Sequence, residues 1–507
     1  MNLNLKDIQK YFNFALVFLL FAACNPVNKS KTNDKAQNKP NVLFIAVDDL
    51  NNWLGCMNDY PNAKTPNLDR LAANGVLFTN AHCQSPLCGP SRASVMSGLR
   101  PSTTGLYGMI DDNKIRRDDN ETTKDIVFLT EYFRNNGYHT MGIGKLFHTH
   151  AAEGTLDESG GREKGFGPLP DKRFVWDGRG TSDGTRYGRT NTDWGTYPEN
   201  DSLMPDHRST NWAIERLNRN YDKPFFLGLG YLRPHVPLYV PQKWFDMHPL
   251  DSIQLVPYKA DDLNDVPSVA LKINDLPMMP STEWAIETGE WRKIIQAYLA
   301  CISFVDYEIG RVLDALEKSG HADNTVIVLW SDHGYRMGEK GTFAKHALWE
   351  PATKAPLMFS APNLPKGKVI HSPAEMLSIY PTLLDLCGLP PYNRNEGKNL
   401  TPLMTGQETG ENDFALTTFG MNNHGVKANG FRYIRYEDGG EELYEHETDP
   451  NEWTNLANKN DYADVKVFMK NYLPKTNANW DSLSTYLFQP YFVDQKARTD
   501  SLARSKN

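Results

Sequence analysis

The 507-residue sequence lacks three features that would place it in common classes of protein. It carries a net charge of −8 and no basic stripe with interleaved aromatic residues, which argues against a nucleic-acid binder. No Cys-x-x-Cys pair occurs among its six cysteines, so neither a zinc site nor a dense disulfide framework is indicated, and one disulfide stays open. The apolar run near its start is shorter than the roughly 20 residues of a membrane span. A chain of this length, 40% hydrophobic, is sufficient for one large domain and a smaller one.

The first 40 residues are typical of an export signal followed by a tether. Lys6 and Lys10 precede an apolar run over residues 14–23 that ends at Cys24, which is the pattern of a signal peptide over residues 1–24. The small residues before Cys24 resemble a bacterial lipobox, which would attach a lipid anchor to this cysteine. Phe21 departs from the usual leucine and leaves plain secretion open. Residues 25–40 are polar, so we expect a flexible tether and an exported protein, either periplasmic, an outer-membrane lipoprotein or secreted.

Strand patterns alternate with helix patterns from residue 41 onward. This alternation predicts an α/β fold in which a large mixed, mostly parallel sheet is sandwiched by helices. Two stretches, residues 151–206 and 241–290, show little periodicity; we interpret the first as a substrate-facing rim, with disorder an alternative for residues 181–191. Strands are predicted at residues 41–47, 76–81, 138–144, 223–230, 325–330 and 356–360, and helices at 65–75, 127–137, 209–218, 291–318 and 375–387.

The pattern changes after about residue 400. Residues 431–436 and 442–445 alternate on either side of a Gly-Gly pair, as the strands of an antiparallel hairpin do, and a helix is predicted over 465–473. We therefore expect a catalytic domain over residues 41–400 and a small α+β subdomain over residues 401–507.

The most informative motif begins at a cysteine, Cys88-Gly-Pro-Ser-Arg92, and continues to Ser97-Gly98. A Gly-Pro turn that opens a helix gathers backbone N–H groups, and Arg92 adds a fork of donors, so the motif favours an anion. Taken alone, the motif could also be a buried cysteine beside a turn.

Acidic and histidine side chains follow two of the predicted buried strands. Asp48 and Asp49 follow the strand at 41–47, while Asp332 and His333 follow the strand at 325–330. Parallel strands end at the same edge of a sheet, so we expect these four side chains to converge on one divalent cation. Hard cations such as Ca²⁺ prefer carboxylate oxygens, although a lone Asp-Asp after a strand is more commonly a solvated turn.

Further basic and histidine residues follow other predicted strands or lie in tight loops. Lys145 and His148 stand at the end of the strand at 138–144, and Lys345 follows a glycine-rich loop. His235 lies between two prolines, which restrict the backbone on both sides of it.

Together these motifs resemble the type I sulfatases, a formylglycine-dependent family of the alkaline phosphatase superfamily, and in particular the iduronate-2-sulfatase-like branch. The resemblance covers nearly the whole mature chain and implies an alkaline phosphatase-like fold. It rests on residues 41–50, the Cys88 motif, Arg100-Pro-x-Thr-Thr-Gly, Gly144-Lys-Leu-Phe-His, Gly230-Tyr-Leu-Arg-Pro-His-Val-Pro and Ser331-Asp-His-Gly.

The resemblance also implies a cofactor and a metal. A maturation enzyme would oxidise Cys88 to 3-oxoalanine (Cα-formylglycine), whose hydrate is the nucleophile of the family. One Ca²⁺ would be bound by this residue together with Asp48, Asp49, Asp332 and His333. Many sulfatases have Asn or Gln at the position of His333, but histidine matches the iduronate-2-sulfatase branch.

The remaining site residues receive roles from the same resemblance. Arg92 and Lys145 would stabilise the hydrate and the sulfate oxygens, and His148 would orient the hydrate. His235 would be the general acid to the leaving sugar oxygen, and Lys345 would bind the sulfate.

The implied activity is hydrolysis of a sulfate ester on a polysaccharide or oligosaccharide. An algal glycan such as ulvan or carrageenan is favoured, and a glycosaminoglycan is next. A phosphodiesterase or phosphonate hydrolase of the same superfamily and a catalytically silent glycan-binding relative stay as alternatives. Candidate rim residues for sugar specificity are His82, Arg233, His346, Trp349 and His424.

Overall fold

The computed structural model describes residues 39–163, 165–178 and 190–504. The predicted signal peptide, Cys24 and nearly all of the predicted tether lie outside these ranges, as do most of residues 181–191. Within them, no helix is both long enough and apolar enough to cross a membrane. No disulfide joins the cysteines of these ranges.

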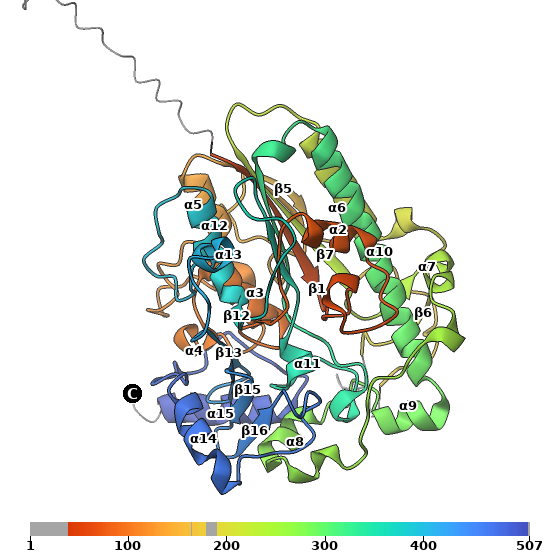
Figure 1. Ribbon diagram of the computed structural model, residues 1–507, viewed down its shortest axis with the longest axis vertical. Coiled ribbons are helices and arrows are strands. Elements are labelled where there is room, and N and C mark those ends of the chain that lie inside the picture. Colours follow the sequence, from red (N-terminus) through yellow and green to blue (C-terminus); the bar gives the residue numbers. More distant parts are fainter. Residues whose placement is uncertain (1–38, 164, 179–189, 505–507) are drawn as a thin grey trace, which may run out of the picture. The chain divides into compact units, whose positions relative to one another are not determined.

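An eight-stranded sheet forms the centre of the structure, in the order β11-β2-β10-β9-β1-β7-β4-β5 (Figure 1). Neighbouring strands pair in parallel, except that β10 runs antiparallel to both β9 and β2. The predicted mixed, mostly parallel sheet is therefore confirmed. The strands are β1 (Asn41–Asp48), β2 (Val76–Phe78), β4 (His139–Gly144), β5 (Glu158–Gly161), β7 (Phe225–Pro234), β9 (Thr325–Ser331), β10 (Leu357–Ser360) and β11 (Lys368–Ile370).

The continuous apolar run of β1 follows from its place inside this sheet. Leu43 and Ile45 pack into one hydrophobic core, whereas Phe44 and Ala46 pack into a second core on the opposite face. Because successive side chains of a strand point to opposite faces, a strand with a core on each side must be apolar at every position.

Helices cover both faces of the sheet (Figure 1). The long amphipathic helix α10 (Trp291–Lys318) has the predicted bounds and packs beside α6 (Pro205–Leu217) on one face. Other helices of this part of the fold are α2 (Pro66–Ala73), α3 (Cys88–Ser97), α4 (Pro101–Thr104), α5 (Leu129–Asn135), α11 (Glu350–Thr353), α12 (Ile379–Leu386) and α13 (Thr401–Thr405).

Three predictions of secondary structure were partly wrong. The strand predicted over residues 76–81 is divided into β2 and β3 (Ala81–His82), which belong to different sheets. The helix predicted over residues 375–387 begins only at Ile379, because Glu375 belongs to β12 (Ala374–Glu375), pairs with His82 of β3 and binds Arg100. The stretch 241–290, predicted to be irregular, contains helices of five to seven residues, too short to show a clear period. They are α7 (Gln242–Asp246), α8 (Ser268–Asn274) and α9 (Thr282–Thr288); before them, β6 (Trp194–Thr196) pairs with β8 (Leu238–Val240).

A four-stranded antiparallel sheet follows in the C-terminal part of the chain. The predicted hairpin is confirmed as β15 and β16, and the predicted helix is confirmed in part as α14 (Ala463–Lys470). Residues from Pro40 onward form one compact unit, and the domain boundary at residue 400 stays a prediction. The remaining elements are β13 (Phe414–Thr418), β14 (His424–Ala428), β15 (Phe431–Arg435), β16 (Glu441–Glu445) and α15 (Pro490–Arg504), of which α15 was not predicted.

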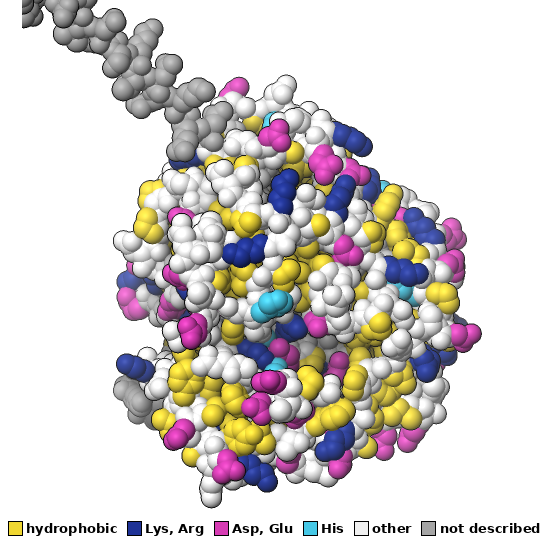
Figure 2. Space-filling model, viewed as in Figure 1, with side chains coloured by type: hydrophobic (Ala, Val, Ile, Leu, Met, Phe, Trp, Pro, Cys, Tyr) yellow, Lys and Arg dark blue, Asp and Glu magenta, His cyan; other side chains and the backbone are white. Residues whose placement is uncertain are grey.

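Acidic and basic side chains are interspersed on the face shown in Figure 2 rather than segregated into single-sign patches. This distribution accompanies a modest net charge of −8.

Candidate active site

The carboxyl ends of β1 and β9 bring the predicted metal ligands together. The two strands pair in parallel with Val47 opposite Ser331, so Asp48 and Asp332 lie at the same edge of the sheet. Asp49 adopts a left-handed backbone conformation (φ 61°), and its N–H donates to Asp332 Oδ1 at 3.2 Å. All three aspartates are fully buried, which excludes the solvated turn that an Asp-Asp pair commonly forms.

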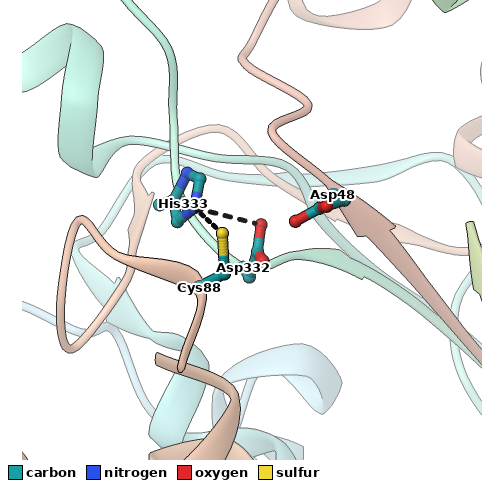
Figure 3. Close-up of side chains that lie close together, drawn as sticks. All are labelled: Asp48, Cys88, Asp332 and His333. Atoms are coloured by element: carbon teal, nitrogen blue, oxygen red, sulfur yellow. Dashed lines mark hydrogen bonds and ion pairs between the residues drawn. The ribbon is translucent and has the colours of Figure 1, made fainter. Parts of the chain in front are cut away.

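Cys88 lies at the N-terminus of α3, and its side chain points into the same cluster (Figure 3). Its Sγ lies 3.1 Å from Lys345 Nζ and 3.3 Å from His333 Nε2. Asp49 Oδ1 is 3.9 Å from the same sulfur. Burial, followed by the charge of Asp48, raises the pKa of the Cys88 thiol to about 12. The unmodified side chain is therefore a protonated thiol at neutral pH, which is a poor nucleophile.

Buried cations neutralise part of the carboxylate charge. Arg92 Nε lies 2.8 Å from Asp332 Oδ2, Lys145 Nζ contacts Asp48 Oδ2, and Lys345 Nζ lies 2.6 Å from Asp49 Oδ1. Burial alone would raise the pKa of Asp48, but the charges of Lys145 and Arg92 hold it well below its ordinary value. The Asp48 carboxylate is therefore ionised across the physiological range.

The cluster nevertheless keeps features that fit a further cation. Asp49 Oδ2 is buried and has no hydrogen-bond partner among the described residues. Burial, opposed in part by Lys345, raises the pKa of Asp49 to about 7, and the charges of Asp48 and Asp332 add to the rise. A buried carboxylate oxygen without a partner, close to other negative charges, is unfavourable, and a bound divalent cation would offset this cost.

The donor set also fits a metal ion in its geometry. Ligand atoms of Asp48, Cys88, Asp332 and His333 all lie within 4.8 Å of one another (Figure 3). The Nδ1–H of His333 donates to the carbonyl oxygen of Gly334 at 2.9 Å, which leaves Nε2 without a proton and directed at the cluster. Oxygen-rich sets with one histidine suit a hard or borderline divalent cation.

Two further histidines adjoin the cluster. His235 Nε2 lies 4.0 Å from Asp49 Oδ2, and its Nδ1–H donates to the carbonyl oxygen of Val236 at 2.6 Å. Burial and then Lys345 keep the pKa of His235 well below its ordinary value. Burial and then Lys145 do the same for the pKa of His148. Both imidazoles are therefore neutral while the site holds no further anion.

A pocket of about 360 Å³ opens onto Cys88, His148, His235 and Lys345. Arg162, Phe166 and Thr192 line it, so the predicted rim segment supplies part of the wall. Met278 and Met279 supply another part. The third part comes from a C-terminal segment, residues 478–488, through Tyr486 and Phe488.

The structure brings together every residue that the sequence proposed for the catalytic centre, while their individual roles stay predictions. Of the five residues proposed for the rim, only His346 lines the pocket. The other four are buried in structural contacts: His82 with Asn80, Arg233 with backbone carbonyls, Trp349 with Glu442 and His424 with Thr418.

Sequence reasoning missed several pocket residues, among them Arg162, Phe166, Tyr486 and Phe488. None of them ends a predicted strand or belongs to one of the quoted motifs, so no local pattern marks them. Tertiary packing alone brings the last two to the pocket, through the pairing of Thr485 with Met109.

Solved structures share this arrangement of sheet and helices. A protein solved in complex with its substrate D-glucosamine-2-N,6-O-disulfate is 21% identical, with a TM-score of 0.67 over 86% of this chain and 96% of that chain. A phosphonate monoester hydrolase from Silicibacter pomeroyi is 20% identical, with a TM-score of 0.68 over 85% and 94% of the two chains. The fold is thus that of the alkaline phosphatase-like enzymes.

The sulfatase family model matches residues 40–389, and a model described as N-sulphoglucosamine sulphohydrolase, C-terminal, matches residues 338–479. A sulfatase of Formosa agariphila is 66% identical and covers 96% of both chains. Iduronate 2-sulfatase of Mus musculus is 31% identical over 76% of this chain and 74% of its own. An ulvan-active sulfatase of Formosa agariphila is 26% identical over 88% and 82% of the two chains. The chain belongs to the sulfatase family and is a sulfuric ester hydrolase of type I.

Proposed function

We propose that this sulfatase removes sulfate from a sulfated polysaccharide or oligosaccharide, with Cys88 matured to formylglycine and one Ca²⁺ in the acidic cluster. The observation that carries the proposal is the position of Cys88 Sγ, which lies within 3.3 Å of both Lys345 Nζ and His333 Nε2 at the N-terminus of α3. The supported class of substrate is sulfated carbohydrate. An algal glycan such as ulvan or carrageenan is favoured, and a glycosaminoglycan is next.

The formylglycine and the Ca²⁺ have defined places in this proposal. The formylglycine hydrate at residue 88 would supply the oxygen that attacks sulfur. Asp48, Asp49, Asp332 and His333 would hold the Ca²⁺, which supplies positive charge beside the anionic ester. Cys88 is 1% exposed in the folded chain, so we propose that the maturation enzyme acts before folding is complete.

The basic side chains of the chain would hold the sulfate group. Lys345 and Lys145 contact the carboxylates of Asp49 and Asp48, and Arg92 binds Asp332, so all three are preorganised; of the three, Lys345 lines the pocket. Fixed cations in a buried site stabilise charge on the sulfate oxygens without having to reorganise during the reaction.

His235 would deliver the proton to the leaving sugar oxygen. Its Nδ1–H is fixed by the carbonyl oxygen of Val236, so Nε2 is the nitrogen that faces the site and exchanges a proton. To act as an acid the neutral imidazole of His235 must first gain a proton, and the negative charge of a bound sulfate ester would favour that step. His148, which lines the pocket, would orient the hydrate.

We further propose that the protein works outside the cytoplasm. The lysines and apolar run before Cys24 support export, and the small residues before that cysteine support a lipid anchor. Degradation of a polysaccharide too large to enter the cell is consistent with such a location.

The decisive experiment measures sulfate release by the matured enzyme from ulvan, carrageenan and heparan oligosaccharides with Ca²⁺ present. We expect release from one class, which would identify the sugar. Mass spectrometry of the Cys88 peptide must first show formylglycine. The Cys88→Ala variant should abolish release while its unfolding midpoint stays near that of the wild type; undiminished turnover in this variant would refute the mechanism.

Two other outcomes correspond to the alternative functions. If no substrate of the panel releases sulfate although formylglycine is confirmed, and if the enzyme hydrolyses a phosphonate monoester, the protein would be a phosphodiesterase or phosphonate hydrolase. The fold shared with the phosphonate monoester hydrolase permits this activity. An unoxidised Cys88 with retained oligosaccharide binding would favour a silent glycan-binding relative.

A further inference from the structure

An aromatic ring that has no role in the proposed mechanism lies flat against the proposed general acid. The rings of Phe166 and His235 are stacked, with centroids 3.9 Å apart and planes only 6° from parallel. Phe166 is partly buried and lines the pocket, whereas His235 is 8% exposed. The two residues come from different parts of the chain, so the stack is a feature of the tertiary fold.

The stack completes the restraint on the imidazole. The hydrogen bond from Nδ1–H to the carbonyl oxygen of Val236 (2.6 Å) fixes one edge of the ring. It does not prevent the ring from tilting about that bond, and the face of Phe166 blocks this tilt on one side. Nε2 is thereby directed at the cluster, 4.0 Å from Asp49 Oδ2. General acid catalysis depends on such alignment of the donating nitrogen with the leaving atom.

Arg233 holds the two stacked residues together. Its Nη1 donates to the carbonyl oxygen of Phe166 at 2.8 Å and to that of His235 at 3.2 Å. Its Nε donates to the carbonyl oxygen of Tyr239 at 3.0 Å, and the side chain is fully buried. A planar guanidinium with fixed donors is well suited to join two backbone segments in one geometry. Arg233, a candidate for the rim, is instead a buried clamp behind it.

Local features support this clamp. Gly167 has φ +106°, and a Cβ there would lie 3.0 Å from Arg233 Nη2, so a larger residue would crowd the guanidinium. Lys145 Nζ lies 5.0 Å and Arg162 Cζ 5.6 Å from the centroid of the Phe166 ring. Both distances are within the range of cation–π attraction, which further fixes the ring.

We propose that Phe166, held by Arg233, is a positioning residue that aligns His235 with the leaving oxygen of the substrate. The inference rests on the proposed role of His235 as general acid. It assigns Phe166 no contact with the reacting atoms; its effect on the reaction acts through the orientation of the imidazole.

The test uses the dependence of the rate on the leaving group. An ester with a poor leaving group needs protonation in the transition state, whereas 4-nitrophenyl sulfate needs little. We would measure kcat/KM for a series from 4-nitrophenyl to phenyl sulfate with the wild type, His235→Ala, Phe166→Ala and Phe166→Tyr. The kcat/KM of Phe166→Ala should fall about tenfold more with phenyl sulfate than with 4-nitrophenyl sulfate. For His235→Ala the difference between the two substrates should be larger still. Phe166→Tyr, which keeps the ring, should restore most of the loss.

The controls separate this inference from the proposed function. Phe174→Ala removes an exposed ring of the same segment that does not line the pocket, and it should leave the leaving-group dependence unchanged. Because Phe166 is only partly buried, its variants should fold, and a thermal unfolding scan would verify this. Equal losses along the series, or a change in KM alone, would show that Phe166 acts on substrate binding and would overturn the inference. If His235→Ala itself showed no excess loss on poor leaving groups, the general-acid role would fail instead.

Discussion

At the scale of single residues, Asp49 shows the strongest conflict between burial and charge. It contacts Lys345, yet its Oδ2 lacks a partner within the described part of the chain and its pKa is raised to about 7. A divalent cation would relieve this conflict. If Asp49 binds the proposed cation, metal binding, protonation and stability are coupled through this residue.

We expect Ca²⁺ to stabilise the chelator-treated wild type and not Asp49→Asn, which also loses sulfate release. Saturation at about 100 times Kd adds about 3 kcal/mol to the free energy of unfolding. Protonation of Asp49 competes with the cation, so the gain should be larger at pH 8 than at pH 6. Thermal unfolding with and without Ca²⁺ at both pH values measures this gain in stability.

Asp112→Asn is the matched control for this prediction. Asp112 is a buried carboxylate close to the site that accepts hydrogen bonds from Thr149, and it is not a member of the metal cluster. Its variant should keep the gain from Ca²⁺. An equal gain in Asp49→Asn would show that the cation binds elsewhere.

At the scale of elements, the close approach of β4 and β7 positions Lys145. Gly144 pairs with Gly230, and Lys145 N–H donates to the carbonyl oxygen of Gly230 at 3.0 Å. A Cβ at residue 230 would lie 2.2 Å from the carbonyl carbon of Lys145, which is backbone and cannot rotate away.

Gly230→Ala should therefore displace Lys145 from Asp48, lower the free energy of unfolding by about 1–3 kcal/mol and reduce sulfate release by at least tenfold. Urea unfolding and kinetics on the same preparations measure both effects. Gly228→Ala is the control, because the three atoms nearest to a Cβ there all belong to the side chain of Leu146, which can adjust. A fully active Gly230→Ala would show that Lys145 tolerates the shift.

A second prediction at this scale concerns His248, which follows α7 and contacts Ser303 of α10 through Nε2 at 2.9 Å. Burial lowers the pKa of His248 from its ordinary 6.5 to about 4. The unfolded chain therefore binds a proton that the folded chain excludes, and the free energy of unfolding falls as the pH drops from about 6.5 to about 4.

When the pH is lowered from 7 to 5, the free energy of unfolding of the wild type should fall by about 1 kcal/mol more than that of His248→Gln, after allowance for solvent screening. Urea unfolding at both pH values measures the difference. The exposed His371→Gln variant should behave as the wild type. Identical pH responses of the wild type and His248→Gln would contradict this linkage.

Sequence patterns predicted the elements whose local signal agrees with their environment. The apolar run of β1 and the long amphipathic α10 are such elements, and the residues at strand ends do lie together in one acidic cluster, whose role as a metal site stays a prediction. The start of the helix at 375–387 was wrong because Glu375 is held as a strand by Arg100. Phe166 lies in the segment that was predicted as a rim, but neither it nor Tyr486 could be singled out, since both reach the pocket through contacts with residues far away in the sequence.

At the scale of the whole molecule, the pocket depends on the C-terminal segment. Thr485 pairs with Met109, and Gly108 N–H donates to Ser484 Oγ at 2.8 Å. A Cβ at Gly108 would lie 2.6 Å from the backbone of Thr485, so glycine permits this close approach. Asp481 also holds the segment in place, because its carboxylate accepts hydrogen bonds from Arg117 at 2.9 Å and from Asn120 at 2.7 Å.

Asp481→Ala should loosen this wall, because it removes the acceptor through which the half-buried side chains of Arg117 and Asn120 hold the segment. We expect the free energy of unfolding to fall by about 1–3 kcal/mol and KM for the oligosaccharide to rise several-fold, with a smaller change in kcat. Kinetics with the oligosaccharide found in the panel would measure this. The exposed Asp461→Ala is the control, and an unchanged KM in Asp481→Ala would mean that the wall does not contact substrate.

The pairing of this segment with the loop at Gly108 also has a consequence for the order of events during synthesis. Gly108 and Ser484 lie 376 positions apart in the sequence. At a translation rate of about 5–20 residues per second, roughly 20–75 s pass between their appearance at the ribosome. Throughout that interval the loop at Gly108 lacks the partners Ser484 and Thr485 that it has in the folded chain, and the pocket lacks the wall that residues 478–488 supply. The oxidation proposed for Cys88 would have this interval in which to take place, before the folded pocket encloses the cysteine.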